Sequence, residues 1–70
     1  MYSFVKSLRN AEHTLRYSIQ ATTTGWEVRE EVDSKVVRHT RHTDWHRVEL
    51  ARKVFAIKAV TLAAEGWQEV

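Results

Sequence analysis

The sequence predicts an α+β fold (βββα) in which a three-stranded antiparallel meander packs against one long C-terminal helix. Over residues 14–42, apolar and polar side chains largely alternate with a period of two, which is the pattern of half-buried strands. From residue 44 the period changes to about 3.6, and the run to residue 65 contains neither glycine nor proline. Turn-forming residues at 22–25 and 33–34 separate the strands.

The first predicted hairpin is specified by its apolar residues. A four-residue loop over residues 22–25 places Ile19 opposite Val28 and keeps the apolar residues of both strands on one face. A slip of one residue would move Ile19 to the face that carries Arg29. In the same register Ala21 lies opposite Trp26, and Leu15 lies opposite Val32.

Charge selects the predicted register of the second hairpin. A two-residue turn would place Arg29 opposite Arg38, and like charges directly across an antiparallel pair are destabilising. A three-residue turn over residues 33–35 instead places Glu30 opposite Arg38, a pairing that contributes roughly 0.2–1 kcal/mol. We therefore predict the three-residue turn, with the third strand ending at about His42. In this register Val32 lies opposite Val36, and Glu27 lies opposite Arg41.

Capping residues mark both ends of the predicted helix. Thr43 and Asp44 are both suited to the N-terminus, because their side-chain oxygens accept hydrogen bonds from free backbone N–H groups. Gly66 lies where a left-handed C-terminal cap belongs, and Trp67 is then placed to contact Leu62 in a Schellman-type closure.

Apolar residues lie on two sides of this helix, in stripes whose centres are roughly 140° apart at about 100° per residue. One sheet covers only one side of a helix, so the second stripe needs a partner. We expect a twofold homodimer with antiparallel helices; the alternative is that Phe4, Val5 and Leu8 cover the stripe within one chain. The first stripe is Val48, Ala51, Phe55, Ala59 and Leu62, and the second, the predicted dimer interface, is Leu50, Val54, Ile57 and Thr61.

Composition favours one small soluble domain over residues 1–70, with residues 1–13 as a peripheral segment. Hydrophobic residues make up 43% of the chain and charged residues 29%, which is typical of globular proteins. Cysteine is absent, which excludes a disulfide framework and a thiolate zinc site. No apolar run approaches the roughly 18–20 residues of a membrane span, and the N-terminus lacks the apolar stretch of a signal peptide, so we expect a cytoplasmic protein.

No catalytic residues, cofactor, metal or small-molecule ligand are predicted. Glu30 and Glu31 are adjacent on a strand and point to opposite faces, so they cannot share a substrate. His39 and His42 diverge in the same way unless the strand ends between them. Zinc nevertheless favours these ligand types, which gather in the sequence as His39, His42, Asp44 and His46.

A nucleic-acid interface is the alternative function. Basic residues on a strand and at a helix N-terminus can hold phosphates, and an exposed tryptophan can stack on a base. A net charge of +2 is small for such a role, and the acidic neighbouring strand neutralises part of it. We therefore favour a non-enzymatic interaction module that dimerises through the helix. The residues of the alternative interface are Lys35, Arg38, Arg41, Trp45 and Arg47.

Overall fold

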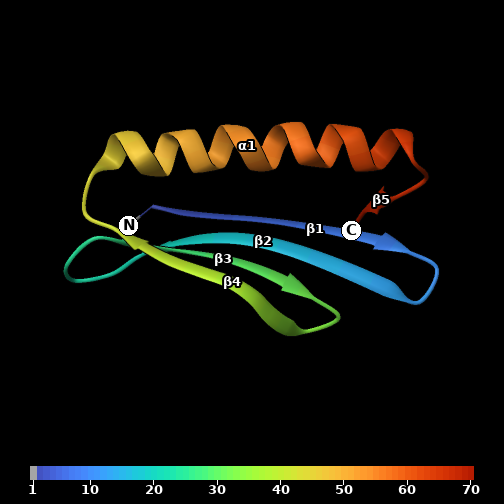
Figure 1. The fold of residues 1–70 in the computed structure, drawn as a ribbon, viewed down its shortest axis with the longest axis horizontal. Coiled ribbons are helices and arrows are strands. Elements are labelled where there is room, and N and C mark those ends of the chain that lie inside the picture. Colours follow the sequence, from blue (N-terminus) through green and yellow to red (C-terminus); the bar gives the residue numbers. More distant parts are fainter. Residues whose placement is uncertain (1) are drawn as a thin grey trace.

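A computed structural model describes residues 2–70 and contains a five-stranded antiparallel sheet with one helix across one of its faces (Figure 1). The strand order is β4-β3-β2-β1-β5, so the first four strands form a meander and the short β5 lies beyond β1. The α+β class is confirmed, whereas the prediction of three strands is too low by two. The elements are β1 (Ser3–Asn10), β2 (His13–Ala21), β3 (Trp26–Val32), β4 (Lys35–His42), α1 (Trp45–Ala64) and β5 (Gln68–Glu69).

The N-terminal segment is not peripheral, which corrects the prediction for residues 1–13; Met1 lies outside the described residues. β1 pairs with β2 along its whole length, and Leu8 of β1 is only 2% exposed. Lys6 interrupts the apolar alternation of this segment, which is why its sequence does not distinguish a strand from a helix. The Lys6 ammonium lies 3.2 Å from the Glu69 carboxylate of β5, so its charge is balanced at the sheet edge.

The register of the first hairpin is as predicted. Ile19 lies opposite Val28, and the loop between β2 and β3 is closed by a 2.7 Å hydrogen bond that the Thr22 N–H donates to the Gly25 carbonyl. The apolar residues of β2 and β3 therefore share the face of the sheet that α1 covers, which we call the inner face. The predicted pairs Ala21–Trp26 and Leu15–Val32 are also present.

The second hairpin has the predicted pairing of Glu30 with Arg38 but a different turn. Glu30 lies opposite Arg38 as predicted, but the turn has two residues, Asp33 and Ser34, with φ angles of 51° and 68°. Positive φ at both positions is typical of the type I′ turn, whose twist matches that of the strands. Lys35, not Val36, therefore lies opposite Val32, and a β-bulge beside Glu30 absorbs the extra residue. Beyond the bulge, Glu27 lies opposite Arg41 as predicted.

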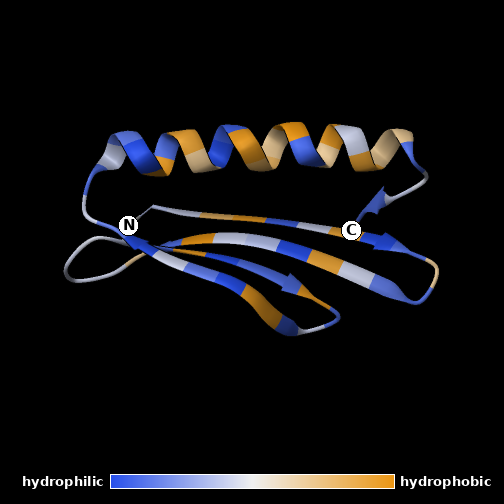
Figure 2. Cartoon of the chain, in the orientation of Figure 1, coloured by the Kyte–Doolittle hydropathy of each residue, from blue (hydrophilic) through white to orange (hydrophobic). Residues whose placement is uncertain are grey.

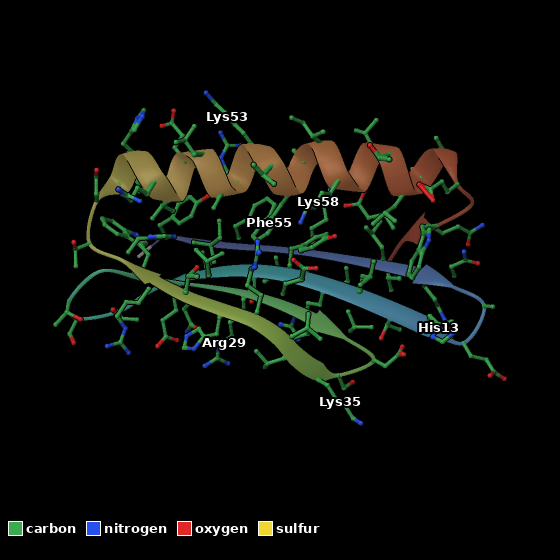
Figure 3. The ribbon with its side chains drawn as sticks, viewed as in Figure 1. His13, Arg29, Lys35, Lys53, Phe55 and Lys58 are labelled. Carbon is green, nitrogen blue, oxygen red and sulfur yellow. The ribbon has the colours of Figure 1, made fainter. Side chains whose placement is uncertain are left out.

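The core lies between α1 and the inner face of the sheet. The Tyr17 ring of β2 stacks on the Phe55 ring of α1, with centroids 4.6 Å apart and planes inclined by 17°. Figure 3 shows Phe55 pointing from α1 toward the sheet and Lys53 pointing away from it. This packing shows that the first apolar stripe of the helix faces the sheet, a choice between the two stripes that the sequence leaves open. The buried residues are Leu8, Tyr17, Ile19, Val28, Val48, Phe55 and Ala59.

Both helix caps are as predicted. The Asp44 carboxylate accepts a 3.0 Å hydrogen bond from the His46 backbone N–H, which fixes the N-terminus of α1. At the other end the Trp67 N–H donates to the Leu62 carbonyl at 3.0 Å, and the Gly66 N–H donates to the Ala63 carbonyl at 3.2 Å. This pair of bonds is the Schellman motif.

A carboxylate joins two turns at one end of the sheet. Asp33, in the turn between β3 and β4, accepts hydrogen bonds from the Thr14 backbone N–H at 2.9 Å and from His13 Nδ1 at 3.0 Å. The Asp33 N–H in turn donates to the Thr14 carbonyl at 2.9 Å. The bond from Thr14, and next the bond from His13, lower the pKa of Asp33 below its ordinary value of 3.8.

Alanine substitutions at the two glycines distinguish destabilisation by a steric clash from destabilisation by an unfavourable backbone conformation. Gly66 has φ +102° and open space around it, so Gly66→Ala is expected to cost only the left-handed conformation, about 1–2 kcal/mol. A Cβ at Gly25 would collide with the backbone carbonyl of His42, so Gly25→Ala is expected to destabilise the fold more than Gly66→Ala. Urea unfolding measures both; equal losses would contradict this packing at Gly25.

Asp33→Asn removes the charge of the Asp33 carboxylate and keeps an acceptor oxygen. Because folding lowers the pKa of Asp33, its charge stabilises the folded state fully above the ordinary value of 3.8. This stabilisation is lost as the pH falls through the folded pKa. The variant is therefore expected to be less stable than the parent at neutral pH, with the difference shrinking in acid. Urea unfolding over a pH series measures this, and a difference that does not change with pH would contradict it.

Candidate interaction surface

The second apolar stripe of α1 is exposed. The exposed fractions of Leu50, Val54 and Ile57 are 48%, 47% and 67%. Thr61 completes the stripe, and its hydroxyl donates a 3.1 Å hydrogen bond to the Ile57 carbonyl. The Thr61 hydroxyl therefore keeps a hydrogen bond when water is removed, so burying the stripe in an apolar contact costs little desolvation free energy. Figure 2 shows apolar residues at intervals along the whole of α1.

The N-terminal segment does not cover this stripe. Phe4 and Leu8 lie on the inner face and pack in the core on the opposite side of α1. Val5 is 54% exposed on the other face of the sheet, which we call the outer face. The alternative in which Phe4, Val5 and Leu8 cover the stripe is therefore wrong, because Phe4 and Leu8 pack between the sheet and the helix and Val5 lies on the outer face.

Two hollows continue the stripe down the flank of α1 that faces β4. One hollow of about 300 Å³ includes Ile57, Thr61 and Tyr17 in its lining. The other, of about 340 Å³, includes Val54 and Arg38. They arise because a helix about 10 Å wide covers only about two strands spaced about 4.8 Å apart, which leaves the inner side of β4 open.

Lys58 stands between the two hollows and lines both of them. Its ammonium lies 3.6 Å from the Glu30 carboxylate and 6.0 Å from the centroid of the Tyr17 ring. Burial, and secondly the Glu30 carboxylate, raises the pKa of Tyr17 above its ordinary value of 10.0. The Tyr17 hydroxyl therefore stays protonated at neutral pH and is unsuited to act as a base.

The residues of the predicted nucleic-acid interface do not form one surface. Lys35 begins β4 beside the turn, whereas Trp45 and Arg47 follow the opposite end of that strand. Arg38 lines a hollow on the inner face. Arg41 lies on the outer face, where its guanidinium donates a 3.1 Å hydrogen bond to the Glu27 carboxylate.

Trp45 is held in an aromatic cluster. Its ring centroid lies 4.9 Å from that of Tyr2 in an edge-on contact and 5.5 Å from that of Trp26. The Trp45 side chain is still 40% exposed. Because the rings pack against one another, their faces are partly occupied, which reduces the area on which a base could stack.

The outer face carries a cluster of charges of which the sequence predicted only the pair of Glu27 and Arg41. Glu27 lies 3.5 Å from Arg29, 3.1 Å from Arg41 and 3.8 Å from His39. The hydrogen bond from Arg41, and next the charges of Arg29 and His39, lower the pKa of Glu27. Figure 3 shows Arg29 on the side of the sheet away from α1. The period of two along β3 was the signal that places Glu27 and Arg29 on one face.

His39 and His42, which are close in the sequence and are of a type that can bind zinc, lie on opposite faces of the sheet. His39 lies beside Glu27 on the outer face, whereas His42 lines a hollow on the inner face. Among residues 2–70, no three histidine, aspartate or glutamate side chains are grouped closely enough to hold a metal ion.

Comparison of the chain with protein-family models, curated proteins and solved structures found no match. Within the described part of the chain, no helix has both the length and the apolar character that crossing a membrane requires.

Titration with a short single-stranded DNA tests the basic residues. Because Lys35, Arg38, Arg41 and Arg47 lie in separate places, we expect no joint shift of their amide resonances at about 50 mM salt, where phosphate binding is strong. Arg47→Gln is expected to leave any residual binding unchanged. A joint shift that Arg47→Gln weakens would support the nucleic-acid interface.

Proposed function

We propose that this chain is a non-enzymatic interaction module that forms a homodimer through α1. The observation that carries the proposal is the exposure of Leu50, Val54 and Ile57 on a helix whose opposite side is already packed on its own sheet. A helix that is apolar on two sides is typical of burial between two layers.

The size of the chain makes this exposure costly. Each large apolar side chain left in water forgoes up to roughly 1.5–3 kcal/mol of burial free energy. A domain of about 60–70 residues has a stability of only a few kcal/mol. Covering Leu50, Val54 and Ile57 would therefore add an amount comparable with the stability of the monomer itself.

The spacing of the stripe suits a second copy of the same helix. Residues 50, 54, 57 and 61 are separated by four, three and four positions, a pattern that is symmetric about its midpoint. A twofold antiparallel pair would therefore bring Leu50 of one copy to Thr61 of the other, and Val54 to Ile57. Every member of the stripe then meets another member of it.

Charges beside the stripe favour the same arrangement. Arg47 and Glu65 are eighteen residues apart, which is five turns, so they lie on the same flank of the helix near its opposite ends. An antiparallel pair would bring Arg47 of each copy near Glu65 of the other. Both side chains are exposed, and the ion pairs within residues 2–70 include neither of them. Such flanking pairs select helix orientation.

Ile57→Glu tests the dimer. The substitution would place a carboxylate in the centre of the apolar contact, where its desolvation is costly. Sedimentation equilibrium is expected to give a dimer mass for the parent chain and a monomer mass for the variant. A parent chain that is monomeric at high micromolar concentration would refute the dimer.

Ala56→Glu is the matched control. Ala56 is also exposed on α1, but it lies on the flank of the helix away from the stripe. It introduces the same charge into the same helix, so its mass is expected to remain that of the dimer. Circular dichroism of both variants establishes that α1 is intact.

A further inference from the structure

β4 forms one edge of the sheet, and no strand within residues 2–70 pairs with its free side. All its residues from Lys35 to Arg41 are exposed. The β-bulge lies at the end beside the turn, so the pairing is regular from Arg38 to His42. A regular open edge presents backbone N–H and C=O groups to an incoming strand.

The hydrogen-bonding pattern identifies which backbone groups point outward. The Asp33 N–H donates to the Thr14 carbonyl at 2.9 Å, so the odd-numbered residues of β3 direct their backbone groups to β2 and the even-numbered ones to β4. Thr40 lies opposite Val28, an even-numbered residue, and its backbone groups therefore face β3. His39 and Arg41, on either side of Thr40, direct theirs away from the sheet.

The charge of this edge limits what can pair with it. β4 holds no acidic residue. A second copy of β4 would bring like charges opposite one another, which is destabilising. An extended segment with acidic side chains would instead meet opposite charges at most positions. The basic residues of the strand are Lys35, Arg38, His39, Arg41 and His42.

At the opposite edge of the sheet, an acidic strand already pairs with a strand that carries a lysine. There β5, which is Gln68–Glu69, adds to β1 as a short antiparallel strand, and the Val70 N–H donates to the Ser7 carbonyl at 2.9 Å. The Glu69 carboxylate lies 3.2 Å from the Lys6 ammonium. An acidic strand held by backbone bonds and an ion pair thus covers part of one edge, while the basic edge stays open.

We propose that β4 binds an extended acidic segment of a partner protein by strand addition. The backbone of the segment bonds to the outward N–H and C=O groups of His39 and Arg41. Its carboxylates lie beside Arg38 on the inner face and Arg41 on the outer face. The guanidinium of Arg41 has five N–H donors, so it can bind a second carboxylate while it holds Glu27. Arg38 shares a hollow with Val54 of the α1 stripe, but the outward backbone groups of His39 and Arg41 lie on the sheet edge, and the proposal does not depend on the dimer.

Amide hydrogen exchange with a synthetic peptide tests the proposal. The probe is a short capped peptide of repeated Glu-Glu-Thr units, so that glutamates lie on both faces of the added strand, and the control is the same peptide with Lys in place of Glu. At saturation the glutamate peptide is expected to slow exchange of the His39 and Arg41 amides by about tenfold or more, while the Thr40 amide, already bonded to β3, is unaffected. The lysine peptide is expected to have no effect.

Proline substitutions locate the contact on the backbone. His39→Pro removes an outward N–H without breaking a bond to β3, a position at which edge strands tolerate proline, and it is expected to abolish binding. Val5→Pro is the matched control, because the Val5 N–H also points away from its partner strand, on β1. It is expected to leave binding unchanged. If His39→Pro fails to fold by circular dichroism, Arg38→Gln replaces it, with an expected several-fold loss of affinity for the glutamate peptide.

Three results would overturn the proposal. Equal binding of the lysine peptide would show that the charge of the segment does not determine its binding to β4. Resonance shifts on β4 without protection of the His39 and Arg41 amides would show side-chain attraction without strand addition. Protection at Ser3 and Val5 on β1 would place the docking edge on the other side of the sheet.

Discussion

The width of the sheet relative to its single helix determines which surfaces of this protein are open. Four long strands spaced about 4.8 Å apart make a sheet nearly twice as wide as a helix of about 10 Å. α1 can therefore bury Leu8, Ile19 and Val28 but leaves the inner side of β4 uncovered. The same helix carries a second apolar stripe whose large side chains stay about half or more exposed within residues 2–70. The hollows between α1 and the inner side of β4 follow from this mismatch, because one helix leaves them unfilled.

Packing beneath the helix depends on strand register. The stack of Tyr17 on Phe55 requires β2 to present its odd-numbered residues to α1, and the four-residue loop before β3 then sets Val28 beside Ile19. A slip of one residue would turn these side chains to the outer face, so the hairpin and the core specify each other. Asp33 adds a polar restraint at the far end, where it joins the turn after β3 to the residues that begin β2.

Two acidic residues of β3, Glu27 and Glu30, form ion pairs with basic residues of β3, β4 and α1. Glu30 lies opposite Arg38 in the register, and its carboxylate lies 3.6 Å from the Lys58 ammonium, so it links β3 to α1. Glu27 binds Arg41 on the outer face. These pairings explain why a stretch that is strongly basic in the sequence does not make a continuous basic surface. They leave the outer rim of β4 as the part of the basic stretch with no acidic strand beside it, because β3 lies on the opposite side.

The sequence by itself determined the helix, its caps, both hairpin registers beyond the turns and the presence of two apolar stripes on the helix, because each of these depends on periodicity, charge and turn chemistry within a short span. Which stripe faces the sheet was decided by the packing of Phe55 on Tyr17. It did not determine the place of β1: Lys6 breaks the alternation, and only pairing with β2 makes the segment a strand. The bulge beside Glu30 was equally hidden, since a two-residue turn with a bulge and a three-residue turn place Arg38 opposite the same carboxylate. The place of Lys35 was decided only by the tertiary structure, because the bulge moves Lys35 from the predicted turn into β4, opposite Val32.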